Sequence, residues 1–303
     1  VVPRPDHEPG PDDPDDPGRA RDRGLRGRIV PEAPEVEALT LFLRERLVGH
    51  IVREVDLVEG RALKTRVRPL TELIGRPVTG ATRHGKHLDL DLDGVHLGIG
   101  FGRAGWATWR EPSDADVESP APEIARFVFD HGILGITDAG DWLSVQLHVV
   151  DAPDDVPAVA KLGPDAIDPG YSREMLAEVV RGRRKQLKAL LQEQETLAGI
   201  GNAYSDEILY AARLSPVAHA SALSEDDITR LHLALHDTLT AAVLARRGVP
   251  ISEQKAAKVA SMRVHGRTGE PCPEGDGVIE DIPGMKGAGQ WCPSCQVLPD
   301  GSA

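Results

Sequence analysis

The hydrophobic period of this chain changes part-way along its length, and that change restricts the fold more than any other feature of the sequence. Five short segments alternate apolar and polar residues between turns rich in Gly and Asp: 51–58, 77–82, 86–92, 95–100 and 127–136. Further along, five segments space their apolar residues as amphipathic helices do: 174–181, 185–192, 203–213, 224–244 and 252–258. Strands and helices in separate runs predict an α+β fold, with a β-sandwich or barrel before a helical domain.

One amphipathic helix precedes the strands. Pro34 suits the first turn of a helix, and Glu35 and Glu37 stand near its positive end. The apolar stripe of this helix consists of Val36, Leu39, Leu43 and Leu47. This spacing predicts a leading helix that ends near Gly49.

Residues 1–30 differ from the rest of the chain because they contain almost nothing to bury. Prolines and aspartates fill the first half of this segment, and arginines and glycines fill the second. Such a composition does not bury enough apolar surface to fold, so we expect a disordered extension. The 303-residue chain has a net charge of −13, and residues 30–303 carry −12 of it. The acidity therefore belongs to the folded part.

The composition excludes some classes of protein. No run of about 18 apolar residues occurs, so we expect no membrane-spanning helix. Three cysteines, an odd number, favour a reducing cytoplasm over a secreted disulfide scaffold. An acidic chain by itself argues against nucleic acid as a partner, yet five cations stand between Arg181 and Lys188. That run is either a solvated surface or a binding patch, and both alternatives stay open on charge alone.

The tail of the chain, residues 262–298, contains all three cysteines. Cys292 and Cys295 are two residues apart, a spacing that lets two thiolates share one tetrahedral ion. Cys272 lies upstream of this pair, but Gly275 occupies the place of its expected partner. A carboxylate or His265 is a candidate fourth ligand. The tail is either a zinc-binding hairpin or a hairpin that folds without metal.

Two further features combine polar chemistry with a structural alternative. Lys86 shares a strand face with leucines, so it is either a strand-end lysine or a lysine placed in a cleft. Gly201 and Asn202 lie between two helical segments, and Asn202 is a good N-cap for the helix 203–213. Such a turn exposes amides that bind phosphate, although glycine turns are also ordinary connectors.

Four strings in order along the chain resemble the motifs of one protein family. Residues 31–37 (PEAPEVE) resemble the amino terminus of the Fpg/Nei family of DNA glycosylases, the formamidopyrimidine-DNA glycosylase type. Residues 199–207 resemble its helix-two-turn-helix signature, and 264–272 and 291–296 resemble the two halves of its zinc-finger hairpin. The resemblance implies a catalytic β-sandwich domain, a helix-two-turn-helix DNA-binding domain and a zinc-finger-like β-hairpin at 31–150, 165–258 and 262–298.

The resemblance also implies a mechanism. Pro31 matches the N-terminal proline whose secondary amine attacks C1′ of a flipped, damaged nucleotide, displaces the base and leaves an iminium linkage. An α-amino group suits this task because its ordinary pKa is about 8. Glu32 matches the acid that protonates the departing base or the sugar oxygen, and Lys86 matches the lysine that assists β-elimination. The implied activity is that of a bifunctional glycosylase and abasic-site (AP) lyase in base-excision repair.

The implied partner is double-stranded DNA with a damaged base or an abasic site. Lys188, Gly201 and Asn202 match residues that hold the DNA backbone around the lesion. Arg103 stands where the family has a wedge methionine, and Lys286 stands beside the place of a phosphate-binding arginine. The lesion that is excised therefore stays open. We expect a monomer that works on the nucleoid in the cytoplasm.

Two other correspondences concern the metal and the gap that a flipped base leaves. Cys272, Cys292 and Cys295 match zinc ligands of the family, so the resemblance implies zinc as the cofactor, with Gly275 in place of the fourth cysteine. The segment 138–142 (DAGDW) corresponds to the family's Asp-Pro-Arg-Arg-Phe segment, which fills the space of the flipped base.

Pro31 is not the first residue of this chain, which bears directly on the mechanism. With Val30 attached, the nitrogen of Pro31 is an amide without basicity. The codon GTG encodes valine internally but starts translation as methionine, which is normally removed before proline. We therefore expect translation to start at position 30, so that residues 1–29 are not part of the protein. If the extension is retained, the alternative is a catalytically inactive module that binds damaged DNA. A third interpretation, an acidic protein-interaction scaffold, rests on charge alone and ranks last.

Overall fold

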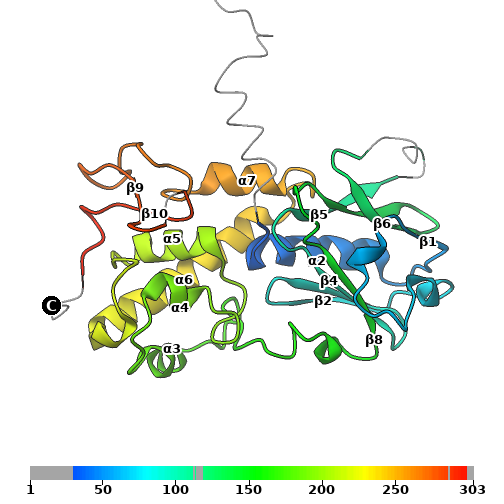
Figure 1. Cartoon of the computed structure of the whole chain (residues 1–303), viewed down its shortest axis with the longest axis horizontal. Helices are drawn as coiled ribbons and strands as arrows, with labels where there is room; N and C mark the ends of the chain where they lie inside the picture. The colour runs from blue at the N-terminus through cyan, green and yellow to red at the C-terminus, as the bar shows by residue number, and fades with distance from the viewer. Residues whose placement is uncertain (1–29, 112, 114–118, 286, 299–303) are drawn as a thin grey trace, which may run out of the picture.

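The computed structural model describes residues 30–111, 113, 119–285 and 287–298 (Figure 1). The expected disordered extension, apart from Val30, lies outside the described residues, and so does Lys286. The β-rich part and the helical part lie side by side in Figure 1, and the tail packs on the helical part.

Two four-stranded antiparallel sheets form the β-rich part. The first has the order β1 (Glu54–Leu57), β6 (Glu123–Val128), β7 (Ile133–Asp138), β5 (Gly105–Arg110). The second has the order β2 (Gly80–His84), β3 (His87–Asp91), β4 (His96–Gly100), β8 (Gln146–Val150). Leu90 of one sheet and Leu134 of the other belong to the same buried cluster. The two sheets therefore form a sandwich with an aliphatic core.

The sequence pattern was wrong about three features of this sandwich. The segment 127–136 is not one strand, because Phe129 N–H donates to the carbonyl of Gly132 (2.8 Å) in a turn between β6 and β7. Strands β5 and β8 had no clear period of their own, and their pairing with β7 and β4 defines them. Lys86 lies in the turn before β3 rather than in the strand, after Gly85 with φ +56°.

The helical part follows the expected pattern closely. Its helices are α3 (Arg173–Val180), α4 (Leu187–Leu191), α5 (Asn202–Ala211), α6 (Glu225–Arg246) and α7 (Gln254–Ser261). Ser224 caps α6, since its Oγ accepts from the N–H of Asp227 (3.1 Å) and Asp227 accepts in return from the N–H of Ser224 (3.0 Å). The apolar faces of these helices share a second buried cluster.

Helix α2 (Ala33–Leu47) joins the two parts. Its stripe of Val36, Leu39, Leu43 and Leu47 is fully buried. Each such side chain contributes about 1.5–3 kcal/mol by leaving water. The helix contacts β2 and β3 in the sandwich and α6 and α7 in the helical part. Its first turn, which follows Pro31 and Glu32, is therefore fixed where the two parts meet (Figure 1).

The tail is a small unit with a cluster of its own. Strands β9 (Glu280–Asp281) and β10 (Gln290–Trp291) pair antiparallel, and the described residues after Met262 contain no helix. Tyr210 of α5 packs there with Val264 and Ile279 beside the cysteines. The expected fold class is confirmed: a β-sandwich with a leading helix, a helical domain and a C-terminal β-hairpin.

The residue bounds of the domains stay predictions. The segment between α6 and α7 contacts the sandwich, because the indole N–H of Trp106 donates to the carbonyl of Ile251 (2.7 Å).

Within the described ranges, no helix combines the length and the apolar character that a bilayer crossing requires.

Candidate active site and metal centre

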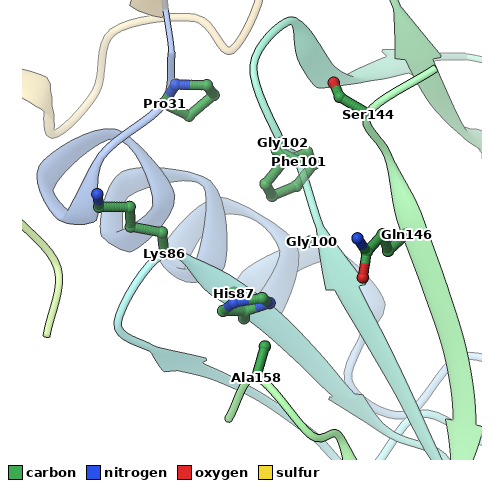
Figure 2. A pocket seen from close by; sticks show the side chains of 9 residues that line it. All are labelled: Pro31, Lys86, His87, Gly100, Phe101, Gly102, Ser144, Gln146 and Ala158. Atoms are coloured by element: carbon green, nitrogen blue, oxygen red, sulfur yellow. The ribbon is translucent and has the colours of Figure 1, made fainter. Parts of the chain in front are cut away.

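Pro31 borders a pocket of about 200 Å³ whose other lining residues belong to the sandwich and to the segment that follows β8. Figure 2 shows its ring on the same side as Lys86, while Phe101 and Gln146 belong to the opposite side. A second pocket of about 220 Å³ is lined by Glu32, Asn202 and Lys258 among others. The two residues at the start of α2 thus face different cavities.

The carboxylate of Glu32 lies at the N-terminal end of α5. It accepts hydrogen bonds from the backbone N–H groups of Gly201, Ala203 (2.9 Å) and Tyr204 (3.3 Å). These amides and the helix dipole favour a negative charge. The sequence pattern offered these amides to a phosphate and assigned the cap to Asn202. Instead α5 begins at Asn202 itself, and Glu32 caps it from 169 to 172 residues away.

Two glycines allow this close approach. A Cβ on Gly201 would lie 2.6 Å from the carboxyl carbon of Glu32, so no larger residue fits beside the carboxylate. Gly199 has φ +99°, a conformation that side chains disfavour, and its carbonyl accepts from the N–H of Ala33 (3.0 Å). Glycine is therefore required at both positions, because the turn packs closely against the start of α2.

Lys258 of α7 is the residue that sequence reasoning missed. Its ammonium is buried and donates to Glu32 (3.0 Å) and to the carbonyl of Val30 (3.0 Å), and it lies 3.2 Å from Glu35. Glu35 also accepts from the hydroxyl of Tyr204 (2.7 Å). The partners lie more than 220 residues apart in sequence, so no local pattern signals the contact.

This network sets the charge of the two groups next to Pro31. Burial alone would raise the pKa of Glu32, but the charges of Lys258 and Lys86 and the hydrogen bonds outweigh burial and lower it below 4.5. The pKa of Lys258 is raised in spite of its burial, because Glu32 and Glu35 both favour its charged form. At neutral pH Glu32 is a carboxylate and Lys258 an ammonium.

Lys86 has the opposite shift. Its pKa is lowered, chiefly because burial disfavours the ammonium, with Lys258 adding to the effect and Glu32 opposing it. The fraction of neutral amine on Lys86 is therefore larger than that of an ordinary exposed lysine. A lysine of this kind beside Pro31 is suited to proton transfer.

Lys188 is buried rather than presented to solvent. Its ammonium contacts Asp206 (2.5 Å) and donates to Ser205 and to the carbonyl of Asn202 (both 3.0 Å). The other oxygen of Asp206 contacts His265 Nδ1 (2.7 Å). Lys188 thus connects the turn at Asn202 with the tail, and its contact with DNA stays a prediction.

The rest of the basic run is largely neutralised within the protein. Lys185 pairs with Glu193 (2.9 Å), Arg183 pairs with the same carboxylate, and Arg181 lies 3.6 Å from Glu225. The run spans the end of α3 and the start of α4, so it is not one helix face. Its cations do not form a free patch of five charges.

Two loops of the sandwich that contact each other carry an exposed cation and an exposed aromatic ring. Arg103 lies in the turn between β4 and β5, and its N–H donates to Ser144 Oγ (2.9 Å). Trp142 lies two residues before Ser144 and is 87% exposed. A tryptophan this exposed is available for stacking on a base.

The three cysteines converge in the tail. The three Sγ atoms lie within 4.8 Å of one another, and Cys272 Sγ and Cys295 Sγ are 3.5 Å apart. Thiolates around tetrahedral zinc are about 3.8 Å apart, so the cluster fits this ion. Burial would raise the pKa of Cys272, but hydrogen bonds led by the Tyr210 hydroxyl lower it to about 7. When zinc is bound, it would tie the two halves of the hairpin together.

The fourth ligand suggested by the sequence is not at the cluster. His265 is engaged with Asp206, and Glu274 is paired with Arg263. Gly275 replaces the missing cysteine, and a Cβ there would lie 3.4 Å from Cys295 Sγ. The described residues therefore offer three thiolates and leave one position to water or another small ligand.

This arrangement predicts the metal content of variants. After dialysis against metal-free buffer, we expect about one zinc per chain in the parent and in His265→Asn, and none in Cys292→Ser. Elemental analysis of the purified proteins measures this. A parent without metal, or a loss of zinc in His265→Asn, would contradict the three-thiolate site.

Comparison with known proteins gives the family. A family model described as the formamidopyrimidine-DNA glycosylase N-terminal domain matches residues 30–144, and one described as the formamidopyrimidine-DNA glycosylase H2TH domain matches 162–253. The formamidopyrimidine-DNA glycosylase of Symbiobacterium thermophilum is 31% identical over 286 residues, covering 90% of this chain and 92% of its own. That of Geobacillus kaustophilus is also 31% identical, over 279 residues, covering 88% and 100%.

A solved relative agrees in three dimensions. The structure of wild-type Lactococcus lactis Fpg with DNA that contains N7-benzyl-Fapy-dG superposes with a TM-score of 0.77 at 25% identity, covering 88% of this chain and 99% of that one. The two family models and these relatives identify a DNA glycosylase of base-excision repair. The chain belongs to the formamidopyrimidine-DNA glycosylase family.

Proposed function

We propose that this chain is a bifunctional DNA glycosylase and AP lyase that removes oxidised bases through a Schiff base on Pro31. One observation carries the proposal. Pro31 borders a pocket together with Lys86, while the adjacent Glu32 is held ionised by the turn at Gly201 and by Lys258. A nucleophile and a lysine of lowered pKa thus share one pocket, and the carboxylate that follows the nucleophile in the chain borders the second pocket.

The first step requires the free secondary amine of Pro31. In a chain that begins at Pro31, the nitrogen lone pair attacks C1′ of the target nucleotide. The N–C1′ bond forms, the glycosidic bond breaks, and its electron pair leaves with the base. The nucleotide is flipped out of the duplex, because C1′ is inaccessible within the stack.

Glu32 manages the proton of this step. It is a carboxylate in the free protein, so it first accepts a proton, from the amine of Pro31, and then gives it to the departing base or the sugar oxygen. Its fixed hydrogen bonds to the amides of α5 hold it in place throughout. Glu32 is thus a proton carrier rather than a preformed acid.

Lys86 acts in the second step. The nitrogen of Pro31 then gives its lone pair to the C=N bond of the iminium as the C1′–O4′ bond breaks, and O4′ takes the electron pair of that bond and a proton. The iminium between Pro31 and C1′ acidifies the C2′ proton. Lys86, as a neutral amine, removes that proton, and the electron pair expels the 3′ phosphate in β-elimination. Hydrolysis of the iminium then releases Pro31.

The proposed DNA partner lies across the junction of the two parts. Asn202 borders the second pocket from the helical side, and Arg103 follows Gly102, which lines the first pocket from the sandwich side. We expect Asn202, the preceding Gly201 and Arg103 to contact the strand that carries the lesion. Lys188 supports the turn from beneath through the carbonyl of Asn202. The solved relative was crystallised with DNA that carries a modified Fapy base, which supports a damaged duplex as the substrate.

Trp142 is proposed to fill the gap that the flipped nucleotide leaves. Its exposure makes it free to stack, and stacking on one base contributes about 1–3 kcal/mol. We therefore expect Trp142→Ala to weaken binding to abasic-site duplex DNA by about 5- to 150-fold. Fluorescence anisotropy with labelled DNA measures this. Trp142→Phe is the control and retains most of the affinity; equal affinity in all three proteins would contradict the stacking role.

A second candidate function is a catalytically inactive module that binds damaged DNA. One observation favours it: the carbonyl of Val30 accepts a hydrogen bond from Lys258 (3.0 Å), so residue 30 has a defined place in the site. Borohydride reduction on abasic-site DNA separates the two candidates, because it converts an iminium into a stable amine. Only the enzyme forms a covalent adduct under these conditions.

A further inference from the structure

Two histidines and an aspartate gather beyond the end of α2 that lies away from Pro31. His50 follows the helix, and Asp130 and His131 lie in the turn between β6 and β7. One nitrogen of each ring and one carboxylate oxygen lie within 4.8 Å of one another. His50 Nδ1 is 3.0 Å and His131 Nδ1 is 3.2 Å from the same oxygen, Oδ1 of Asp130.

The hydrogen bond on the far side of His131 fixes its tautomer. His131 Nε2 lies 2.7 Å from the backbone carbonyl of Arg46, which only accepts, so Nε2 carries the hydrogen. In a neutral ring Nδ1 then has no hydrogen, and its lone pair faces the carboxylate of Asp130. Two acceptors at this distance need either a proton or a metal ion between them.

We propose that His50, Asp130 and His131 bind a divalent transition-metal ion of the zinc class, at a site separate from the cysteine cluster. Imidazole and carboxylate together suit zinc and its neighbours among the first-row metals. Nitrogen and oxygen ligands of tetrahedral zinc are about 3.4 Å apart, so small movements of these side chains complete the site. The bond from His131 to the carbonyl of Arg46 is the support that metal-bound histidines commonly have.

The surroundings allow an ion to enter and stay. The side chains of His50, Asp130 and His131 are 38%, 48% and 31% exposed, so water reaches the site and fills the remaining positions. The guanidinium of Arg46, a neighbouring cation, is paired with Glu111 (3.3 Å). The rings of His50 and His131 are stacked with centroids 3.7 Å apart, and Trp109 packs against His131 at 5.3 Å.

The ion would join two segments that are 80 residues apart in sequence. His50 follows the end of α2, the helix that Pro31 and Glu32 precede, and the other two ligands lie in the turn between β6 and β7 of the first sheet. A metal bound only in the folded state stabilises that state by mass action. A bound ion would therefore stabilise the packing of α2 on the sandwich, independently of the reaction that the chain catalyses.

The test is zinc binding by the full chain after dialysis, so that the cysteine cluster keeps its own ion. Isothermal titration with zinc chloride is expected to give one further site in the parent and none in His50→Asn or His131→Asn. At zinc a hundredfold above Kd, the melting temperature of the parent is expected to rise by about 5 °C, and that of either variant to stay unchanged.

The matched control is His236→Asn. His236 and Asp237 also form an exposed histidine–aspartate contact (3.2 Å), but they lie outside both metal-ligand groups. This variant is expected to bind zinc like the parent. The proposal is overturned if the parent takes up no further zinc, or if both histidine variants of the cluster bind it as the parent does. A hydrogen between His131 and Asp130 would then be the cation in the site.

Discussion

A chain that begins at Pro31 is expected to become covalently attached to abasic-site duplex DNA in borohydride, whereas a chain that begins at Val1 is not. The reason is electronic: the nitrogen of Pro31 is a basic secondary amine only when no acyl group is attached to it. Loss of a catalytic nucleophile typically costs about 10⁴-fold or more in rate. Denaturing electrophoresis of the reduced mixture measures the adduct, and peptide mapping locates the attached residue.

Lys86 provides the control for this experiment, because it is the other candidate amine at the pocket. In the chain that begins at Pro31, Lys86→Gln is expected to form the adduct and to cleave the DNA strand more slowly, by about 10²- to 10⁴-fold. An adduct that maps to Lys86, or equal adducts from both starts, would refute the assignment of Pro31. If both chains bind abasic DNA and neither is attached, the binding module becomes the better account.

The mass of the protein purified from its natural source completes this test. A polypeptide that starts at Pro31 agrees with translation from position 30. Retention of residues 1–29 would contradict that hypothesis and would favour the binding module.

Lys258→Met is expected to unfold far more readily than the parent. The substitution keeps most of the length of the side chain but removes the buried counter-ion of Glu32, and it leaves Glu35 with Arg246 alone (3.3 Å). Breaking a buried pair in this way costs about 3–5 kcal/mol. Urea denaturation at pH 7 measures the loss. Lys255→Met is the matched control on the same helix, because Lys255 donates to a backbone carbonyl, that of Ala104 (3.2 Å), and about 1 kcal/mol is expected there.

The pH dependence of this loss has a definite sign. The pKa of Glu32 is lowered in the folded parent, so its contribution to stability is complete above its ordinary pKa of 4.5 and is lost as pH falls through the lowered value. The raised pKa of Lys258 gives a contribution that is complete below 10.5 and is lost at higher pH. The difference between parent and Lys258→Met is therefore expected to be largest near neutral pH and to shrink in acid. A constant difference from pH 3 to 7 would contradict the pairing.

The sequence predicted the general architecture because the spacing of apolar residues and the residues that start or end an element are local signals. Helix α6 begins directly after Ser224, the first residue of the predicted segment 224–244, and the stripe of α2 is buried as its spacing indicates. Strands β5 and β8 were missed because their neighbours in the sheets define them more than their own residues do. The turn at residues 129–132 does have a local signal, Asp130-His131-Gly132 between two apolar stretches, and the prediction of a single strand overlooked it.

The site shows the same division between local and distant information. Sequence motifs alone indicate Pro31, Glu32, Lys86 and Asn202, and these four residues do line the two pockets at the start of α2. Lys258 carried no signal, since a lysine on an amphipathic helix is ordinary until its partners are known. Asn202 was assigned the wrong contact for the same reason, because its competitor for the helix cap comes from a residue far away in the sequence.

One carboxylate therefore serves two purposes in this protein. Glu32 transfers a proton in the proposed reaction. Its carboxylate also holds the start of α2 against the first turn of α5 through hydrogen bonds. A proton that arrives on Glu32 reduces its attraction to the helix amides and to Lys258 at the same moment. Chemistry and the rigidity of the junction are thus tied to a single proton. A substitution of Glu32 that abolishes proton transfer also removes its hydrogen bonds to α5 and to Lys258. Catalytic activity and the rigidity of the junction are therefore lost together at this position.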